Sequence, residues 1–288
     1  MIRARARSRF DWGEGFVRMQ PGRLRKGVPA MRTLAEIKQA LHGADREAYE
    51  AMARALAADE RKGVKQALAS TLRRLDAQDA ERARLEGMYA FQREFCESGL
   101  VAGLDEVGRG PVAGPLTVAA VVLPDNPRIE GLNDSKQIPP EKRERIAKEV
   151  KEIALAWDIE HIAPAFIDEH GMSASLRTAF ARAVAAVEGQ GFVLDCVLLD
   201  GNPLGIDSRE RNVVKGDAKC ASIAAASIIA KVERDALMCE YAEQFPGYGF
   251  ESNKGYASAE HISAILELGL SPLHRTSFCR AWTQESLF

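Results

Sequence analysis

The sequence lacks the marks of several large protein classes. Its five cysteines are scattered without Cys-x-x-Cys spacing, which argues against a disulfide framework and a cysteine-ligated zinc site. No apolar run reaches the roughly 18 residues that cross a membrane, and no apolar segment follows the arginine-rich N-terminus as a secretory signal requires. The histidines do not pair at metal-ligand spacing, and no phosphate-binding glycine loop is present. We therefore expect a cytoplasmic protein with no membrane partner and no histidine metal ligand.

A strong excess of charge of one sign is also missing. The 288 residues carry a net charge of -2, and 46% of them are hydrophobic, which is enough for a globular core. Residues 1–32 hold nine basic and two acidic side chains, so the remainder carries a net charge of -9. This distribution excludes a uniformly basic nucleic-acid binder, and any binding to nucleic acid must use local patches.

The periodicity of the chain predicts four segments. Residues 1–32 have no helical or strand period and are read either as a disordered basic arm that contacts phosphates or as a mis-assigned start, because Met31 begins the first periodic segment. Residues 33–98 have apolar side chains at three- and four-residue spacing, typical of helices, with Asp59 as a cap. Residues 99–280 alternate strand and helix patterns, and residues 281–288 form a tail.

The third segment predicts a mixed sheet. Strands are expected at 100–106, 116–123, 157–162, 195–200 and, as a short edge strand, 212–215. Helices are expected at 140–156, 175–187, 217–245 and 259–268, and the one from 217 has the longest pattern. If the first three strands form a meander and a helical crossover brings the fourth strand parallel to the first, Asp105 and Asp200 become neighbours at the centre of the sheet.

Acidic side chains stand at these strand ends and at the predicted helix start: Asp105, Glu106, Asp200 and Asp217. Buried carboxylates are unfavourable unless a cation compensates them. Carboxylate oxygens suit Mg²⁺ or Mn²⁺, and two such ions roughly 3.5–4 Å apart stabilise both oxygens of a phosphodiester hydrolysis. For Asp105 and Glu106 alone an acidic loop is the simpler explanation, but the common placement of all four favours a metal site.

The sequence around the first two acids resembles the signature of the ribonuclease HII family. Residues 105–111 read Asp-Glu-Val-Gly-Arg-Gly-Pro, and Ala-Gly-Pro follows at 113–115. The family's later acidic motifs match Leu-Leu-Asp-Gly at 198–201 and Lys-Gly-Asp-Ala-Lys at 215–219. The resemblance covers roughly residues 98–280, with a weaker match over 33–97. It implies a ribonuclease H-like fold, a mixed five-stranded sheet flanked by helices, with an N-terminal helical extension.

The resemblance also implies an activity. Members hydrolyse the RNA strand of RNA–DNA hybrids and nick DNA 5′ of embedded ribonucleotides, leaving 3′-hydroxyl and 5′-phosphate ends. The expected partners are therefore RNA–DNA hybrids and DNA duplexes that contain ribonucleotides, in ribonucleotide removal during DNA replication and repair. The family's catalytic and metal-binding residues match Asp105, Glu106, Asp200 and Asp217, which would use Mn²⁺ or Mg²⁺ in a two-metal-ion mechanism.

Substrate-binding residues are implied in the same way. The family element whose main chain senses the 2′-hydroxyl matches Gly108, Arg109 and Gly110. The tyrosine that stacks on the deoxyribose after the ribonucleotide matches Tyr256, although Ala-Ser at 257–258 replaces the commoner Gly-Thr. Phosphate contacts are implied, with surface or capping roles as the alternative, for Ser135, Lys136, Lys219 and Lys231. For the matching motif at 274–278 a structural role is expected, with contact to the nucleic-acid backbone as a second role. For the basic side chains at 59–64 the expectation is backbone contact or a solvated helical face.

The final residues resemble the short motif that docks bacterial proteins into the replication sliding clamp. Gln284, Leu287 and Phe288 would make that contact, and a tail packed on its own domain is the alternative. Two other functions stay open. A ribonuclease HIII-type nuclease is disfavoured by Gly-Arg-Gly and Tyr256, and a hybrid-binding protein without catalysis is disfavoured by the four carboxylates. We expect a monomer.

Overall fold

The structure is a computed structural model that describes residues 33–96 and 99–283. Contacts divide the chain into two compact units, residues 1–76 and 77–288, and the division falls within helix α3 (Lys62–Arg93). The basic arm at 1–32 and the expected clamp-binding residues Gln284, Leu287 and Phe288 lie outside the described residues.

The first unit is a small helical core. Helices α1 (Leu34–His42) and α2 (Arg46–Ala55) pack with the start of α3 around a buried apolar cluster: Ile37, Leu41, Ala44, Tyr49, Val64 and Leu75. A capping box begins α1, because the Thr33 hydroxyl accepts from the Glu36 N–H and the Glu36 carboxylate accepts from the Thr33 N–H. Asp59 does not cap α3 as expected. Its carboxylate accepts from the N–H of Arg61, in the turn before the helix.

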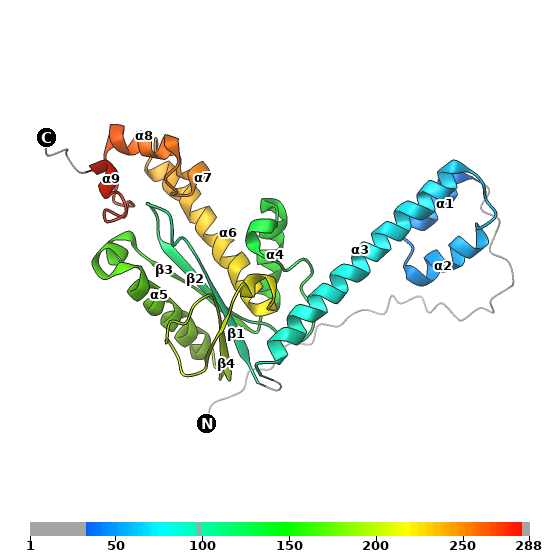
Figure 1. The fold of residues 1–288 in the computed structure, drawn as a ribbon, viewed down its shortest axis with the longest axis horizontal. Coiled ribbons are helices and arrows are strands. Elements are labelled where there is room, and N and C mark those ends of the chain that lie inside the picture. The colour runs from blue at the N-terminus through cyan, green and yellow to red at the C-terminus, as the bar shows by residue number, and fades with distance from the viewer. Residues whose placement is uncertain (1–32, 97–98, 284–288) are drawn as a thin grey trace, which may run out of the picture. The chain divides into compact units, whose positions relative to one another are not determined.

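The second unit is built on a five-stranded sheet with the strand order β3-β2-β1-β4-β5 (Figure 1). Its strands are β1 (Val101–Val107), β2 (Leu116–Val122), β3 (Ala156–Ile162), β4 (Cys196–Asp200) and β5 (Glu210–Val213). The first three form an antiparallel meander, β4 runs parallel to β1, and β5 runs parallel to β4. The predicted mixed sheet is confirmed, although β5 begins and ends two residues earlier than expected.

Helices cover both faces of this sheet. Helix α5 (Pro164–Gly189) packs on one face chiefly against β2 and β3, and it bends at Gly171, so that its longer part contains the helix expected at 175–187. Helix α6 (Ala221–Gln244) lies on the other face with α4 (Pro140–Ile153) and the end of α3 (Figure 1). Helix α4 ends three residues earlier than predicted, because Leu155 already donates its N–H to Val122 beside the start of β3.

The helix expected from Asp217 begins later, at Ala221. Asp217 lies instead in a 3₁₀ turn, Gly216–Ala218, between Lys215 in the left-handed conformation (φ 57°) and Cys220 in an extended one (φ -118°). These backbone conformations interrupt the helical pattern that the side chains suggest. At 24 residues, α6 is also shorter than α3, which has 32.

Short elements complete the unit. They are the 3₁₀ turn η1 (Ser135–Gln137) and the helices α7 (Phe250–Asn253), α8 (Ala259–Leu268) and α9 (Arg280–Thr283). The bounds of α8 agree with the prediction. Within residues 33–96 and 99–283, no helix combines the length and apolar character needed to cross a membrane.

Close contact between β1 and α6 depends on a glycine. A Cβ atom added to Gly103 would overlap the backbone of Ser222 and Ile223, neither of which can move without shifting the first turn of α6. Small side chains continue this contact along α6, where Ala224, Ala225 and Ala226 are fully buried. The strand that carries Asp105 is therefore fixed against the helix by steric fit.

We predict that Gly103→Ala lowers the free energy of unfolding by about 3 kcal/mol, because backbone must shift to accept the methyl group. Gly87 in α3 is the matched control, since a Cβ there would meet nothing within 4 Å. Gly87→Ala should raise the free energy of unfolding by up to about 1 kcal/mol through helix propensity. Urea unfolding followed by circular dichroism measures both, and equal effects of the two substitutions would contradict the steric account.

Candidate active site

The strand pairing brings the predicted acids to one end of the sheet. In the parallel ladder Leu104 lies opposite Leu199, so Asp105 and Asp200 follow as the next pair. The Asp200 carboxylate accepts the N–H of Gly216 at 2.6 Å, which holds the turn that carries Asp217 beside β4. Asp105 and Asp217, which are 112 positions apart in the sequence, are therefore both brought close to Asp200. The pairing of Asp105 with Asp200 is the one that the sequence predicts.

The carboxyl groups of Asp105, Glu106 and Asp217 resist ionisation. Asp105 is only 7% exposed, and burial together with the charges of Glu106 and Asp200 raises its pKa well above the ordinary value. Burial also raises the pKa of Glu106, against the opposing effect of the Arg109 guanidinium 3.1 Å away. For Asp217 the pKa is raised by burial and then by the charge of Asp200. Negative charge has been gathered here without enough positive charge to balance it.

The acids have the chemistry of a site for a hard cation but do not form a closed ligand set. Their oxygens are the donors that Mg²⁺ and Mn²⁺ prefer. Lys136 and Arg109 are the cations that act on Glu106, and Lys136 also acts on Asp217. Among the residues that the structure describes, however, no three acidic, histidine or cysteine side chains are arranged to hold one metal ion. The donor set fits a divalent ion in kind, and its ligand geometry stays open.

The turn between β1 and β2 carries the predicted Gly-Arg-Gly element. Gly108 has φ 95°, and a Cβ there would overlap the Arg234 side chain, so only glycine fits. The Cβ position of Gly110 lies 3.7 Å from a ring carbon of Tyr256. The N–H groups of Val112 and Ala113 both donate to the carbonyl of Gly255, at 2.9 and 3.2 Å. The two elements expected to recognise the substrate are therefore neighbours.

Tyr256 presents its ring to solvent from a well-held loop. Its side chain is 48% exposed, beside the turn of Gly110. The hydroxyl of Ser258 accepts from the N–H of His261 and caps α8. The Ala-Ser departure from the family's Gly-Thr thus keeps a hydroxyl that serves as the helix cap.

A buried histidine pair supports this loop. His261 donates from Nδ1 to the Tyr256 carbonyl (2.8 Å), and His274 accepts at Nδ1 from the Ser271 N–H (2.9 Å). The proton between their Nε2 atoms, 3.1 Å apart, therefore belongs to neutral His274 and is donated to neutral His261. Burial and the neighbouring His261 lower the pKa of His274 to about 4. Sequence reasoning missed this pair, because histidines 13 residues apart show no pattern.

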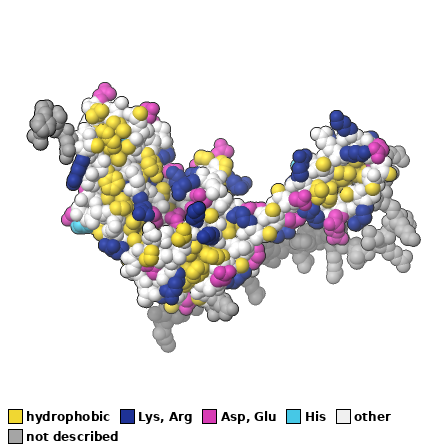
Figure 2. All heavy atoms as spheres, in the orientation of Figure 1, with side chains coloured by type: hydrophobic (Ala, Val, Ile, Leu, Met, Phe, Trp, Pro, Cys, Tyr) yellow, Lys and Arg dark blue, Asp and Glu magenta, His cyan; other side chains and the backbone are white. Residues whose placement is uncertain are grey.

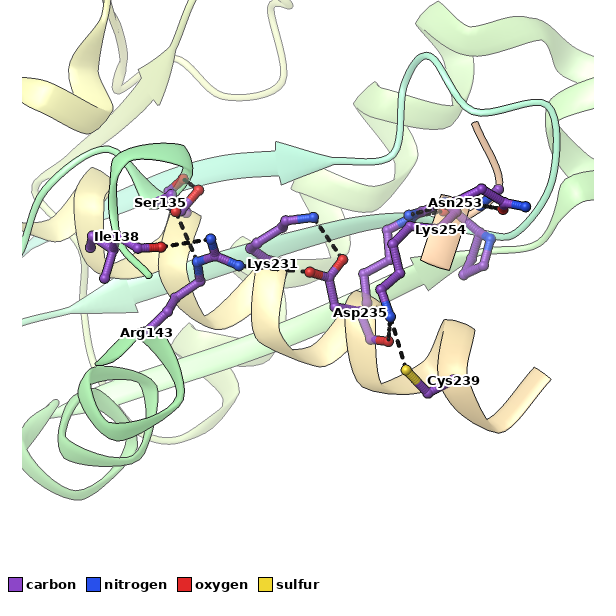
Figure 3. Close-up of polar contacts among 12 residues, drawn as sticks. Ser135, Ile138, Arg143, Lys231, Asp235, Cys239, Asn253 and Lys254 are labelled. Atoms are coloured by element: carbon purple, nitrogen blue, oxygen red, sulfur yellow. Dashed lines mark hydrogen bonds and ion pairs between the residues drawn. The ribbon is translucent and has the colours of Figure 1, made fainter. Parts of the chain in front are cut away.

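The residues expected to contact phosphate lie in different surroundings. Ser135 is buried, and its hydroxyl lies 3.0 Å from that of Ser227. Lys219 donates to the carbonyl of Val214. Lys231 binds the Asp235 carboxylate at 2.7 Å, and Figure 3 shows its side chain directed along α6 to that acid. Lys136 is exposed, and its positive charge acts to lower the pKa of Glu106 and Asp217.

Basic side chains do not cover either unit uniformly. In Figure 2 the face on which α6 lies carries Lys and Arg side chains beside acidic ones. In the helical unit, Arg61 pairs with Asp59 and Lys65 pairs with Glu60, so part of the basic segment at 59–65 is neutralised locally. Basic side chains on this face could therefore attract nucleic acid only at local patches.

Two buried arginines, Arg234 and Arg275, also support the site, and sequence reasoning passed over Arg234. Both side chains are fully buried against the turn of the Gly-Arg-Gly element. Arg234 falls on the same face of α6 as Ser227 and Ala230, and an arginine within a buried stripe was the available signal. Arg275 lies in the motif for which a structural role was expected.

The raised pKa of Asp105 predicts that its charge destabilises the protein when no cation is present. In chelator at pH 7, Asp105→Asn should raise the free energy of unfolding by about 1 kcal/mol, the usual size of a single-substitution effect, because the amide removes the unfavourable buried charge. The gain should shrink as the pH falls toward about 4, where Asp105 is protonated in the folded and increasingly in the unfolded wild type. Urea titrations across this range measure it, with exposed Glu251→Gln as control; a less stable Asp105→Asn at pH 7 would contradict the account.

Comparison with known proteins agrees with this architecture. The family model described as Ribonuclease HII matches residues 102–281, and the one described as Ribonuclease HII N-terminal domain matches residues 33–96. Ribonuclease H2 from Pyrococcus horikoshii OT3 is 28% identical, with a TM-score of 0.53 over 64% of this chain and 94% of that one. The ribonuclease HII of Archaeoglobus fulgidus, solved with PCNA, is 27% identical, with a TM-score of 0.55 over 65% of this chain and 98% of that one.

A more distant structure shares the fold. Bst ribonuclease HIII in complex with Mn²⁺ is 21% identical, with a TM-score of 0.53 over 65% of this chain and 71% of that one. The match of the family model over most of the chain identifies the family. The chain belongs to the ribonuclease HII family and is a ribonuclease H enzyme, an endoribonuclease that acts on RNA–DNA hybrids.

Proposed function

We propose that this enzyme also nicks DNA 5′ of single embedded ribonucleotides, leaving 3′-hydroxyl and 5′-phosphate ends, and serves ribonucleotide removal in DNA replication and repair. The observation that supports it is the juxtaposition of Gly110 with the exposed ring of Tyr256, next to the strand that carries Asp105. A ribose sensor and a deoxyribose platform side by side suit a junction between RNA and DNA.

The metal-dependent part of the proposal rests on the four carboxylates. Asp105, Glu106, Asp200 and Asp217 would hold Mg²⁺ or Mn²⁺, two ions according to the family resemblance. The raised pKa values of Asp105, Glu106 and Asp217 support this, because a bound cation would offset the repulsion and burial that raise them. Such ions would act as Lewis acids on the attacking and leaving oxygens of the phosphodiester.

The chain's own groups would orient the substrate. Exposed Gly110 leaves room for the main chain to approach a sugar, Gly108 allows the turn to pack on Arg234, and the ring of Tyr256 offers a face for the next deoxyribose. Exposed Lys136 could contact a phosphate near the acids, whereas Lys231 would first have to leave Asp235. Phosphate contacts through Ser135 would need its buried hydroxyl to become accessible, so Lys136 is the better supported of the predicted contacts.

The decisive assay is cleavage of a DNA duplex that carries one ribonucleotide, with Mg²⁺, Mn²⁺ or chelator. We expect nicking 5′ of the ribonucleotide by the wild type, and a loss of about 10³-fold in chelator or in Asp105→Asn, because several kcal/mol of charge stabilisation disappear. Asp158→Asn is the matched control, since burial also raises the pKa of that carboxyl, but Asp158 lies on strand β3.

Two further arms separate the alternatives. Tight binding of the duplex without nicking in any metal would favour a hybrid-binding protein and sink the nuclease assignment. Tyr256→Ala should lower cleavage at the single ribonucleotide more than cleavage within a long hybrid, and equal losses would contradict a junction role for this ring. Preference for long hybrids in the wild type would favour a ribonuclease HIII-type specificity.

We propose, separately, that the C-terminal residues bind the replication sliding clamp. The support is the sequence of Gln284, Leu287 and Phe288, and the Archaeoglobus fulgidus ribonuclease HII that was solved in complex with PCNA. Deleting Leu287 and Phe288 should abolish retention of the enzyme on immobilised clamp and leave nicking of a short duplex unchanged. Retention of the truncated enzyme would refute the contact.

A monomeric state and a cytoplasmic location also stay proposals. All five cysteines are free thiols, which supports a reducing compartment. Sedimentation velocity at micromolar concentration would test the monomer, and a stable dimer would overturn it.

A further inference from the structure

Two fully buried guanidinium groups lie behind the Gly-Arg-Gly turn and bind its main chain. Arg275 donates to the carbonyls of Gly108 (2.7 Å), Arg109 (3.1 Å) and Gly114 (2.8 and 3.1 Å). Neither Arg275 nor Arg234 forms an ion pair with a carboxylate of the residues 33–96 and 99–283. Their partners are peptide carbonyls.

The second arginine connects this turn to the Tyr256 loop. Arg234 donates to Pro115 (3.0 Å) and Ala113 (3.2 Å) in the turn, and to the carbonyl of Lys254 (2.9 Å) two residues before Tyr256. Lys254 is held at its other end too, because its Nζ donates to the main chain of Asp235 on α6 (Figure 3). One rigid side chain thus fixes the spacing between the two recognition elements.

This arrangement is costly, which indicates a specific use. Burial lowers the pKa of both groups, that of Arg275 to about 10, and the two positive charges repel each other. The charges of Asp168 and Asp235 offset this only in part. Buried charge without a counter-ion is strongly unfavourable unless hydrogen bonds satisfy it. Five of the eight carbonyls from Gly108 to Pro115 accept from these two side chains. A planar fork of five donors can serve several carbonyls at fixed angles, which a lysine cannot.

Peptide geometry gives the consequence. In a trans peptide the N–H points opposite to the C=O of the same plane. Because Arg275 draws the carbonyls of Gly108 and Arg109 inward, the N–H groups of Arg109 and Gly110 point away from the buried guanidinium. Within the described part of the chain, neither N–H has a hydrogen-bond acceptor. Two unpaired donors are therefore held in a fixed direction, in a turn whose Gly110 lies next to the Tyr256 ring.

The geometry points to Arg275 and Arg234 as positioning residues for ribonucleotide selection: Arg275 aims the N–H groups of Arg109 and Gly110 at the ribose oxygens, and Arg234 sets the Tyr256 loop against them. This inference rests on the proposed function of the Gly-Arg-Gly turn. Arg275 is itself anchored, because its N–H donates to the Val112 carbonyl and the carboxylate of Asp168 binds the next residue, Thr276. The donors are thus preorganised before substrate arrives.

The test compares Arg275→Lys and Arg234→Lys with Arg209→Lys. Arg209 is a matched control, because it also binds a main-chain carbonyl, that of Leu194, together with the carboxylates of Glu188 and Asp207, outside the recognition turn. Each variant is assayed on a duplex with one ribonucleotide. Affinity for that duplex and for its all-DNA counterpart is measured with Asp105→Asn added to prevent nicking.

We expect Arg275→Lys to lower kcat by roughly 10²-fold, because a misplacement of about 1 Å costs that much, while KM changes less than kcat. The preference for the ribonucleotide duplex over all-DNA should fall at least tenfold in Arg275→Lys and Arg234→Lys and persist in Arg209→Lys. Unchanged kcat and preference in folded Arg275→Lys would overturn the inference. A wild type without any preference would instead refute the proposed function of the turn.

A second measurement does not depend on the folding of these variants. In Asp105→Asn, the amide resonances of Arg109 and Gly110 should shift more with the ribonucleotide duplex than with all-DNA, because the donors meet an additional oxygen. Identical shifts with both duplexes, in a protein that still prefers the ribonucleotide duplex, would overturn the aiming of these donors.

Discussion

The parallel pairing of β1 with β4 is the contact on which the site depends. It makes Asp105 and Asp200 neighbours although the whole crossover through β2, β3 and α5 separates them in the sequence. The Asp200 carboxylate in turn accepts a hydrogen bond from the N–H of Gly216, which fixes the turn that carries Asp217. The absence of a side chain at Gly103 lets α6 lie directly on this pair of strands. Register and steric fit together decide where the carboxylates stand.

Like charges are grouped at two places near the Gly-Arg-Gly turn: acidic groups at the strand ends, and two arginines behind the turn. The carboxylates at the strand ends repel one another, and Arg234 and Arg275 repel one another behind the main chain. Peptide carbonyls satisfy the guanidinium groups, whereas the partners of the carboxylates, such as Arg109 at Glu106 and the Gly216 N–H at Asp200, leave the pKa of Asp105 and Glu106 raised. The arginines are therefore stabilised by contacts within the protein, whereas the carboxylates would be stabilised further by a bound cation.

The sequence predicts what local patterns encode. Apolar β-branched runs located the strands, and the meander with one crossover was enough to place Asp105 beside Asp200. The prediction that a helix begins at Asp217 was wrong, because the left-handed Lys215 and the extended Cys220 interrupt a continuous helical pattern. A structural role was expected for the motif that holds His274 and Arg275, but not its contacts. The contacts of Arg234, Arg275 and the pair His261–His274 were not predicted, since their main partners are backbone carbonyls or each other.

The long-range contact of Arg275 has a consequence for synthesis of the chain. Its hydrogen bond to Gly108 spans 167 residues, whereas all four carboxylates are complete by residue 217. A nascent chain emerging from the ribosome therefore acquires its acids well before the side chain that orders the turn beside them. During synthesis the contact cannot form before residue 275 has been added. The contacts that order the Gly-Arg-Gly turn are thus added after the acids, with the segment that carries His274 and Arg275.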